Sequence, residues 1–167
     1  CLPPDPITHM MLMRGAPFFY ADGRGSVEVP EGATRVGIAR GFEYGPVEFA
    51  VEVPAGETVR RTVKLKRWID LPAMGWHSGE MYIHPFDQEP EDTAVCLLAE
   101  DLHVGNLLIW GTGFSLRYHS DQFFRGKPER WPDAAHVAYY NEEFRNNTYG
   151  HLCLIDLRSL VYPMGTG

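Results

Sequence analysis

The sequence predicts an α+β fold in which an antiparallel β-sandwich is followed by an α/β unit, and three observations lead to this prediction. Apolar and polar residues alternate through much of residues 17–70, with Pro- and Gly-containing turns between the runs. A helical stripe follows within residues 92–102, and a nearly continuous apolar run occupies residues 104–110. The 17 Gly and 13 Pro residues favour short strands over a helical bundle. We therefore expect two domains, residues 1–70 and residues 71–167.

The composition narrows the classes of partner. The 167 residues are 44% hydrophobic and 22% charged, which is an ordinary globular balance. The net charge is −7, and the densest basic cluster, residues 60–67, alternates with apolar residues as on the solvent face of a strand. We therefore expect no nucleic-acid partner. No apolar window is long enough to suggest a membrane span.

The cysteines and the first residue do not identify the cellular compartment of the protein. Cys1, Cys96 and Cys153 include no metal-type pair, and an odd count disfavours a disulfide scaffold. Cys96 and Cys153 lie in apolar patterns, so we expect both to be buried thiols. The chain starts at Cys1 rather than at Met, which indicates either a removed leader or a piece of a longer protein, with a lipid anchor on Cys1 as a further alternative. Secreted, periplasmic and cytoplasmic locations all remain open.

The first half is expected to consist of strands and turns. Strand-like residues 18–20 end at a turn over residues 21–23, and further period-two runs occupy residues 27–29, 36–38, 47–53 and 59–65. Pro-x-Gly turns separate several of these runs. Short alternating strands of this kind predict the small sandwich.

The second half is expected to alternate strand, helix and strand. Residues 81–84 form a short strand that Pro85 ends, and Asp92 is the expected N-cap of the helix. The apolar run 104–110 predicts a strand buried on both faces, which completes one βαβ unit. After a long polar loop over residues 111–135, two further strands are expected near residues 135–145 and 151–157.

Candidate chemistry gathers where these strands end. The relevant side chains are Glu80, His84, Glu143 and His151. Histidine together with carboxylate is the ligand set that zinc, manganese and iron prefer. A metal-activated water is the usual route to hydrolysis near neutral pH. For His84 and His151, an ordinary hydrogen-bonded role remains an equal alternative.

Several of these segments resemble one known family. The segments are residues 68–70, 75–84, 99–104, 141–145 and 150–152. In order and spacing they are similar to the carbaryl-hydrolase-like branch of the PHP-domain metallohydrolases. The resemblance implies a carboxypeptidase-regulatory-like sandwich over residues 1–70 and part of a PHP-type β/α barrel over residues 71–167. It also implies a divalent metal (zinc, manganese or iron) and cleavage of an ester, carbamate or phosphoester bond in a small-molecule substrate.

The match identifies individual positions. Residues His84, Glu143 and His151 fall on metal-ligand positions of the family, with Glu80 near the metal. The family motif Gly-Asp-x-His-x-His reads here as Gly79-Glu80-Met81-Tyr82-Ile83-His84, so Tyr82 stands where the first histidine would be. The remaining ligands of the family lie in strands beyond those of this chain, and we expect a partner chain or the rest of a longer protein to cover the edges of the half barrel. The alternative is a non-catalytic binding or structural module in which the sandwich recognises a partner or ligand and the barrel portion only packs.

Overall fold

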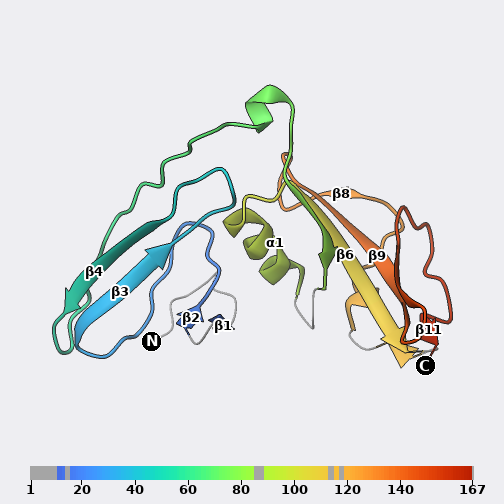
Figure 1. The fold of residues 1–167 in the computed structure, drawn as a ribbon, viewed down its shortest axis with the longest axis horizontal. Helices are drawn as coiled ribbons and strands as arrows, with labels where there is room; N and C mark the ends of the chain where they lie inside the picture. Colours follow the sequence, from blue (N-terminus) through green and yellow to red (C-terminus); the bar gives the residue numbers. More distant parts are fainter. Residues whose placement is uncertain (1–10, 14–15, 85–88, 113–114, 117–118, 167) are drawn as a thin grey trace.

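The computed structural model describes residues 11–13, 16–84, 89–112, 115–116 and 119–166, and within these ranges the fold is α+β with one α-helix (Figure 1). The Cys1 alternatives lie outside the described residues. In chain order the elements are β1 (Met11–Met13), β2 (Ala16–Phe18), β3 (Gly32–Ile38), β4 (Val47–Val53), the 3-10 helix η1 (Pro72–Met74), β5 (Gly79–Ile83), α1 (Pro90–Ala99), β6 (Val104–Thr112), β7 (Ser115–Leu116), the 3-10 helix η2 (His119–Phe123), β8 (Glu129–Arg130), β9 (Val137–Asn146), β10 (Gly150–Leu154) and β11 (Gly165–Thr166).

The main sheet has the strand order β10–β9–β6–β5. Strands β5, β6 and β9 are parallel, and β10 returns antiparallel to β9. The short strands β7, β8 and β11 pair with β6 or β9. Because β5 and β6 are parallel neighbours joined through α1, the predicted βαβ unit is confirmed.

One face of this sheet packs against α1 and forms the core. Leu97 of α1, Leu107 of β6 and Ala138 of β9 are buried together. A Cβ added to Gly105 would come within 3.0 Å of Leu97 Cδ2, so the glycine lets helix and strand pack closely. Full burial of a leucine side chain contributes about 1.5–3 kcal/mol, so this contact anchors α1 on the sheet. In Figure 1, α1 lies between this sheet and the β3–β4 hairpin.

Two local expectations for the second half are wrong. The N-cap of α1 is Glu89, and Asp92 lies inside the first turn. Pro90 takes the first helical position, where its fixed φ fits and its missing N–H costs nothing. Cys153 is exposed because β10 is an edge strand, and Cys96 is only partly buried.

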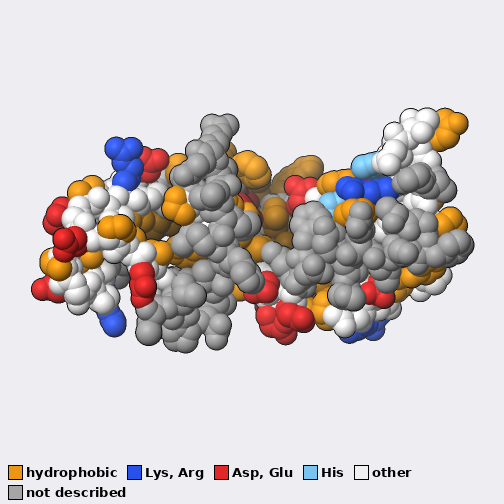
Figure 2. Space-filling model, turned by 90° about the horizontal axis from the view of Figure 1, so that it is seen from below, with side chains coloured by type: hydrophobic (Ala, Val, Ile, Leu, Met, Phe, Trp, Pro, Cys, Tyr) orange, Lys and Arg blue, Asp and Glu red, His pale blue; other side chains and the backbone are white. Residues whose placement is uncertain are grey.

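The first half contains less pairing than expected in the described ranges. Strands β1–β2 and β3–β4 form two separate two-stranded sheets. Residues 27–29 and 59–65 are not strands, although Val59, Val63 and Leu65 keep the predicted alternation by being half-buried between exposed neighbours. Alternation therefore marked the apolar face of an extended segment, but a strand also requires a hydrogen-bonded partner. Figure 2 shows hydrophobic and charged side chains interspersed on the surface at the hairpin end.

Ion pairs connect the first half to the end of α1. The carboxylate of Asp101 lies 2.7 Å from Arg40 Nη2 and 3.2 Å from Arg67 Nη2. Gly41 has φ +44°, and a Cβ there would lie 2.6 Å from the carbonyl oxygen of Glu100. A side chain at position 41 would therefore break this close approach. As for membranes, the described ranges contain no helix with the length and apolar character that crossing would need.

Candidate functional site

The side chain of Glu143 is the centre of the candidate site. It lies on β9 and is 0% exposed. Four side chains contact its carboxylate. They are His84, His151, Arg145 and Tyr82.

The structure brings three of the four sequence-predicted residues together. His84 Nε2 is 3.0 Å from Glu143 Oε2, and His151 Nδ1 is 2.7 Å from Glu143 Oε1. Glu80 is exposed, and its Oε1 accepts a hydrogen bond of 2.9 Å from the backbone N–H of Tyr82. The Glu80 carboxylate is therefore turned back onto its own strand.

Strand register explains why residues far apart in sequence meet here. Glu143 of β9 is level with Trp110 of β6 and with Cys153 of β10. His84 directly follows β5, and its Nδ1 lies 3.1 Å from the carbonyl oxygen of Leu108 on β6. The site thus lies toward the carboxyl ends of parallel strands, where α/β sheets gather functional groups.

The Leu108 contact orients the imidazole of His84. A carbonyl oxygen only accepts hydrogen bonds, so Nδ1 carries the proton and donates it. Nε2 is then aimed at the carboxylate of Glu143. In its neutral form such a histidine would point a lone pair at the carboxylate, which is favourable only if a proton or another cation lies between them. This is the orientation that an outer hydrogen bond commonly gives to a metal-binding histidine.

Two contributors were not predicted as site residues. The Tyr82 hydroxyl donates a hydrogen bond to Glu143 Oε1, and Arg145 Nε lies 2.8 Å from Glu143 Oε2. The Arg145 guanidinium also lies 3.9 Å from the ring centroid of Trp110, which is a cation–π contact. Arg145 has the same parity as Glu143 along β9 and therefore shares its face, a signal that the sequence did contain.

These contacts set the charge states. Burial opposes ionisation of Glu143, but the hydrogen bonds from Tyr82 and Arg145 outweigh burial, so the pKa of Glu143 is lowered. The hydrogen bond to Glu143, followed by burial, raises the pKa of Tyr82. The site therefore holds an ionised carboxylate and a protonated phenol, and a protonated phenol is a poor metal ligand.

The donor chemistry suits a divalent metal, but the arrangement is not that of a formed metal site. Two ligand atoms bound to one tetrahedral zinc ion at ~2.0–2.2 Å lie ~3.3–3.6 Å apart, whereas His84 and His151 lie 3.0 Å and 2.7 Å from Glu143, which are hydrogen-bond distances. The two histidines also approach different oxygens of the carboxylate. No group of three or more His, Cys, Asp or Glu side chains in the described ranges has the arrangement of a metal site.

A buried pair of asparagines lies beside the site, on the face of the sheet that carries Glu143. Asn141 Nδ2 donates to Asn106 Oδ1 at 2.6 Å, and Asn106 Nδ2 donates to the carbonyl oxygen of Met81 at 2.8 Å. Asn141 Oδ1 in turn accepts from the backbone N–H of Leu157 at 3.2 Å. These bonds link β5, β6 and β9 beside the site, and they hold the strands that carry Tyr82 and Glu143.

The opposite ends of the parallel strands carry a second group of histidines. His103 stacks on His136 with ring centroids 5.4 Å apart, and His77 meets His103 edge-on at 5.2 Å. Each precedes one of the strands β5, β6 and β9. Their spacing in sequence carried no such signal. The contact follows from the parallel register, which brings the three strand starts together.

Comparisons of the chain with family models, with curated proteins and with solved structures gave no match.

Proposed function

We propose that this chain is part of a metal-dependent hydrolase, with His84, Glu143 and His151 as the residues that hold a divalent metal (zinc, manganese or iron). The observation that carries the proposal is the convergence of two imidazoles on one buried carboxylate, at 3.0 Å and 2.7 Å. The resemblance in the motifs around these residues supports it. Within the same proposal, residues 1–70 belong to a β-sandwich and residues 71–167 to a PHP-type barrel.

The residues of the chain have separate roles in this proposal. Leu108 fixes the tautomer of His84, so that Nε2 faces the site. Glu143 supplies the negative charge, and its lowered pKa keeps it ionised at neutral pH. A divalent metal there would supply the Lewis acidity that ionises water near neutral pH, for attack on an ester, carbamate or phosphoester. Since Arg145 and Tyr82 contact the same carboxylate, Glu143 must give up one of these contacts to bind a metal.

A further part of the proposal concerns the strand edges. In the described sheet, β5 and β10 are the two edge strands. Edge strands expose unpaired backbone groups, which another strand commonly covers. We propose that the rest of a barrel, or a partner chain, pairs with them.

The second candidate function is a non-catalytic binding or structural module. The observation that favours it is the ion pair between Arg145 Nε and Glu143 Oε2 at 2.8 Å, together with the Tyr82 hydrogen bond. In this alternative the cluster of charges ties β5, β9 and β10 together and binds no metal. The two candidates make opposite predictions for removal of Arg145.

Metal content tests the two candidates. The purified chain is stripped with a chelator, dialysed against zinc or manganese and assayed by elemental analysis. We expect about one metal per chain in the wild type and background metal in His151→Ala, whose side chain is 39% exposed and can be removed with little effect on packing. His77→Ala, an exposed histidine at the other end of the strands, is the matched control and should keep its metal.

Arg145→Met separates the candidates further. If the hydrolase proposal holds, the freed carboxylate should bind zinc more tightly than the wild type does. If the structural alternative holds, the variant should remain without metal. A wild type that stays metal-free in zinc and in manganese would reject the hydrolase proposal.

A further inference from the structure

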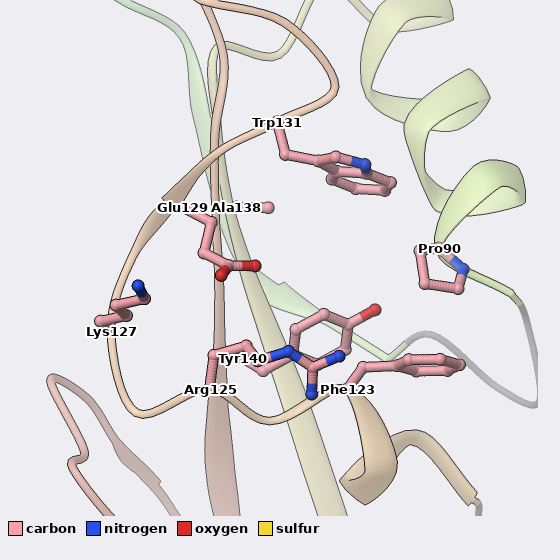
Figure 3. Close-up of a pocket in the computed structure, with 8 residues that line it drawn as sticks. All are labelled: Pro90, Phe123, Arg125, Lys127, Glu129, Trp131, Ala138 and Tyr140. Atoms are coloured by element: carbon pink, nitrogen blue, oxygen red, sulfur yellow. The ribbon is translucent and has the colours of Figure 1, made fainter.

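A pocket lies on the face of the sheet that carries α1, opposite the face of Glu143. Its volume is about 190 Å³. Ala138 and Tyr140 of β9 form its floor, Pro90 of α1 closes one side, and residues 123–131 surround the rest (Figure 3). Tyr140 and Glu143 differ by an odd number of positions on β9, so their side chains point to opposite faces. The pocket is therefore separate from the candidate metal site.

Three aromatic side chains form the apolar wall of the pocket. Figure 3 shows the ring of Trp131 on one side of the space and the rings of Tyr140 and Phe123 on the other. Phe123 and Tyr140 have ring centroids 6.0 Å apart. A cavity of ~150 Å³ lined by apolar side chains holds one benzene ring. The volume of this pocket, about 190 Å³, therefore suits one ring with a short polar group.

Charges of both signs lie at the rim. Arg125, Lys127 and Glu129 all line the pocket, and Figure 3 shows the Glu129 carboxylate directed toward the space and the Arg125 guanidinium at the Tyr140 end. The Arg125 guanidinium is held by Nη1, which donates to the carbonyl oxygen of Gln122 at 2.7 Å. Neither Arg125 nor Glu129 forms an ion pair with another side chain in the described part of the protein. Both charges are thus available to a ligand.

Tyr140 offers a ligand its ring and not its hydroxyl. The hydroxyl oxygen is buried and has no hydrogen-bond partner among the described residues. Burial is the main reason that the pKa of Tyr140 is raised to about 12. Because the oxygen has almost no exposed surface, a ligand in the pocket contacts the aromatic ring.

We propose that this pocket binds a small zwitterion with one aromatic ring, of the aromatic α-amino acid class. The ring lies between Trp131 and Tyr140, as aromatic groups commonly pack. The carboxylate of the ligand pairs with Arg125, whose planar guanidinium matches a carboxylate. The ammonium group pairs with Glu129. A ligand with charges of both signs matches Arg125 and Glu129 together, and Lys127, which also lines the pocket, adds a second positive charge that favours the carboxylate.

Three ring-matched probes test the proposal on the whole chain by titration followed in amide NMR spectra. They are L-phenylalanine, 3-phenylpropionate (no ammonium) and 2-phenylethylamine (no carboxylate). We expect L-phenylalanine to bind at least about tenfold more tightly than either analogue, as a charge-assisted hydrogen bond allows. Arg125→Gln should remove its advantage over the amine, and Glu129→Gln its advantage over the acid.

Arg35→Gln, which changes an exposed arginine on β3 outside the pocket, is the matched control and should bind like the wild type. Because both pocket variants change exposed side chains, unchanged amide spectra without ligand will show that each remains folded. Equal binding of the three probes would overturn the proposal. So would the absence of binding at millimolar concentrations, or variants that bind L-phenylalanine as the wild type does.

Discussion

Glu142 and Glu143 are neighbours on β9, and both are 0% exposed. The pKa values of their carboxyl groups nevertheless shift in opposite directions. Glu143 faces two histidines, an arginine and a tyrosine, and its pKa is lowered. Glu142 faces the other side of the sheet, where burial raises its pKa and Oε2 accepts a hydrogen bond of 2.7 Å from the backbone N–H of Val161. Its Oε1 has no hydrogen-bond partner in the described ranges.

The difference shows that burial alone does not decide what a carboxylate does. On one face, positive charge and hydrogen-bond donors outweigh the cost of desolvation, so Glu143 is ionised and can act as a ligand. On the other face a single backbone donor does not outweigh that cost, so the pKa of Glu142 is raised. A functional carboxylate is therefore recognised by its partners.

We expect Glu143→Gln to lower the free energy of unfolding more than any other substitution considered. The amide keeps the shape but removes the charge that Arg145 faces, and breaking a buried ion pair costs about 3–5 kcal/mol. Because Arg145 is partly exposed, we expect the free energy of unfolding to fall by about 2–4 kcal/mol, measured by urea denaturation at pH 7. The folded-state pKa of Glu143 is lowered, so its contribution is present above the unfolded value near 4.5 and is lost as the pH falls through the folded value. The variant should therefore approach the wild type in acid, and an unchanged difference there would contradict this origin.

Arg145→Met should cause the next largest loss of stability. It removes the ion pair with Glu143 and the cation–π contact with Trp110, while the methionine side chain keeps apolar contact with the ring. A hydrogen bond to a charged group contributes about 1.5–3 kcal/mol, and we expect a loss in this range by denaturation in metal-free buffer. Arg158→Met, at an exposed position, is the control and should change stability by less than about 0.5 kcal/mol. Equal stabilities of the two variants would show that Arg145 does not hold the cluster.

Glu142→Gln should change the free energy of unfolding less, and its pH dependence should have the opposite sign to that of Glu143→Gln. The folded-state pKa of Glu142 is raised, so its contribution is present below the unfolded value and is lost as the pH rises through the folded value. At pH 7 the amide should be as stable as the wild type or more stable, and on acidification the wild type should gain relative to the variant. A clear loss of stability at pH 7 would mean that Glu142 has a cationic partner.

The smallest change in stability is expected from substitution of the histidines that precede the strands, His103 and His136. Burial, and then the neighbours His136 and His77, lower the pKa of His103 although Asp101 and Glu43 oppose the shift. A lowered folded-state pKa means that the unfolded chain binds more protons, so stability falls as the pH drops below the unfolded value of about 6.5. We expect a shallower slope between pH 6.5 and 5 in His136→Gln, measured by thermal unfolding. An equal slope in both proteins would exclude this histidine contact as its cause.

Sequence patterns predicted the secondary-structure elements whose burial follows directly from their place in the sheet. The apolar run at residues 104–110 became the central strand β6, because a strand between two partners is buried on both faces. The motif positions His84, Glu143 and His151 meet, because parallel β5, β6 and β9 and the antiparallel return of β10 bring them to the same edge of the sheet. Both results depend on local pattern and on parallel strand order.

Features that depend on distant partners were not predicted. Alternation at Val59, Val63 and Leu65 gave half-burial without a strand, because no described strand pairs with that segment. The roles of Tyr82 and Arg145 required knowledge of which side chains face the carboxylate. Glu80 was expected near the site, but its hydrogen bond to its own strand turns the carboxylate away. Tertiary partners decided the outcome for the extended segment, Tyr82 and Arg145, and a local hydrogen bond decided it for Glu80.

Anomalous X-ray diffraction at the zinc edge, from crystals grown with zinc, tests the proposed metal site most directly. We predict one strong peak ~2.0–2.2 Å from His84 Nε2, from a carboxylate oxygen of Glu143 and from His151, with Arg145 or Tyr82 displaced from that carboxylate. Crystals with no peak at these residues, and with the Arg145–Glu143 pair intact, would contradict a metal-dependent site and leave the cluster with a structural role.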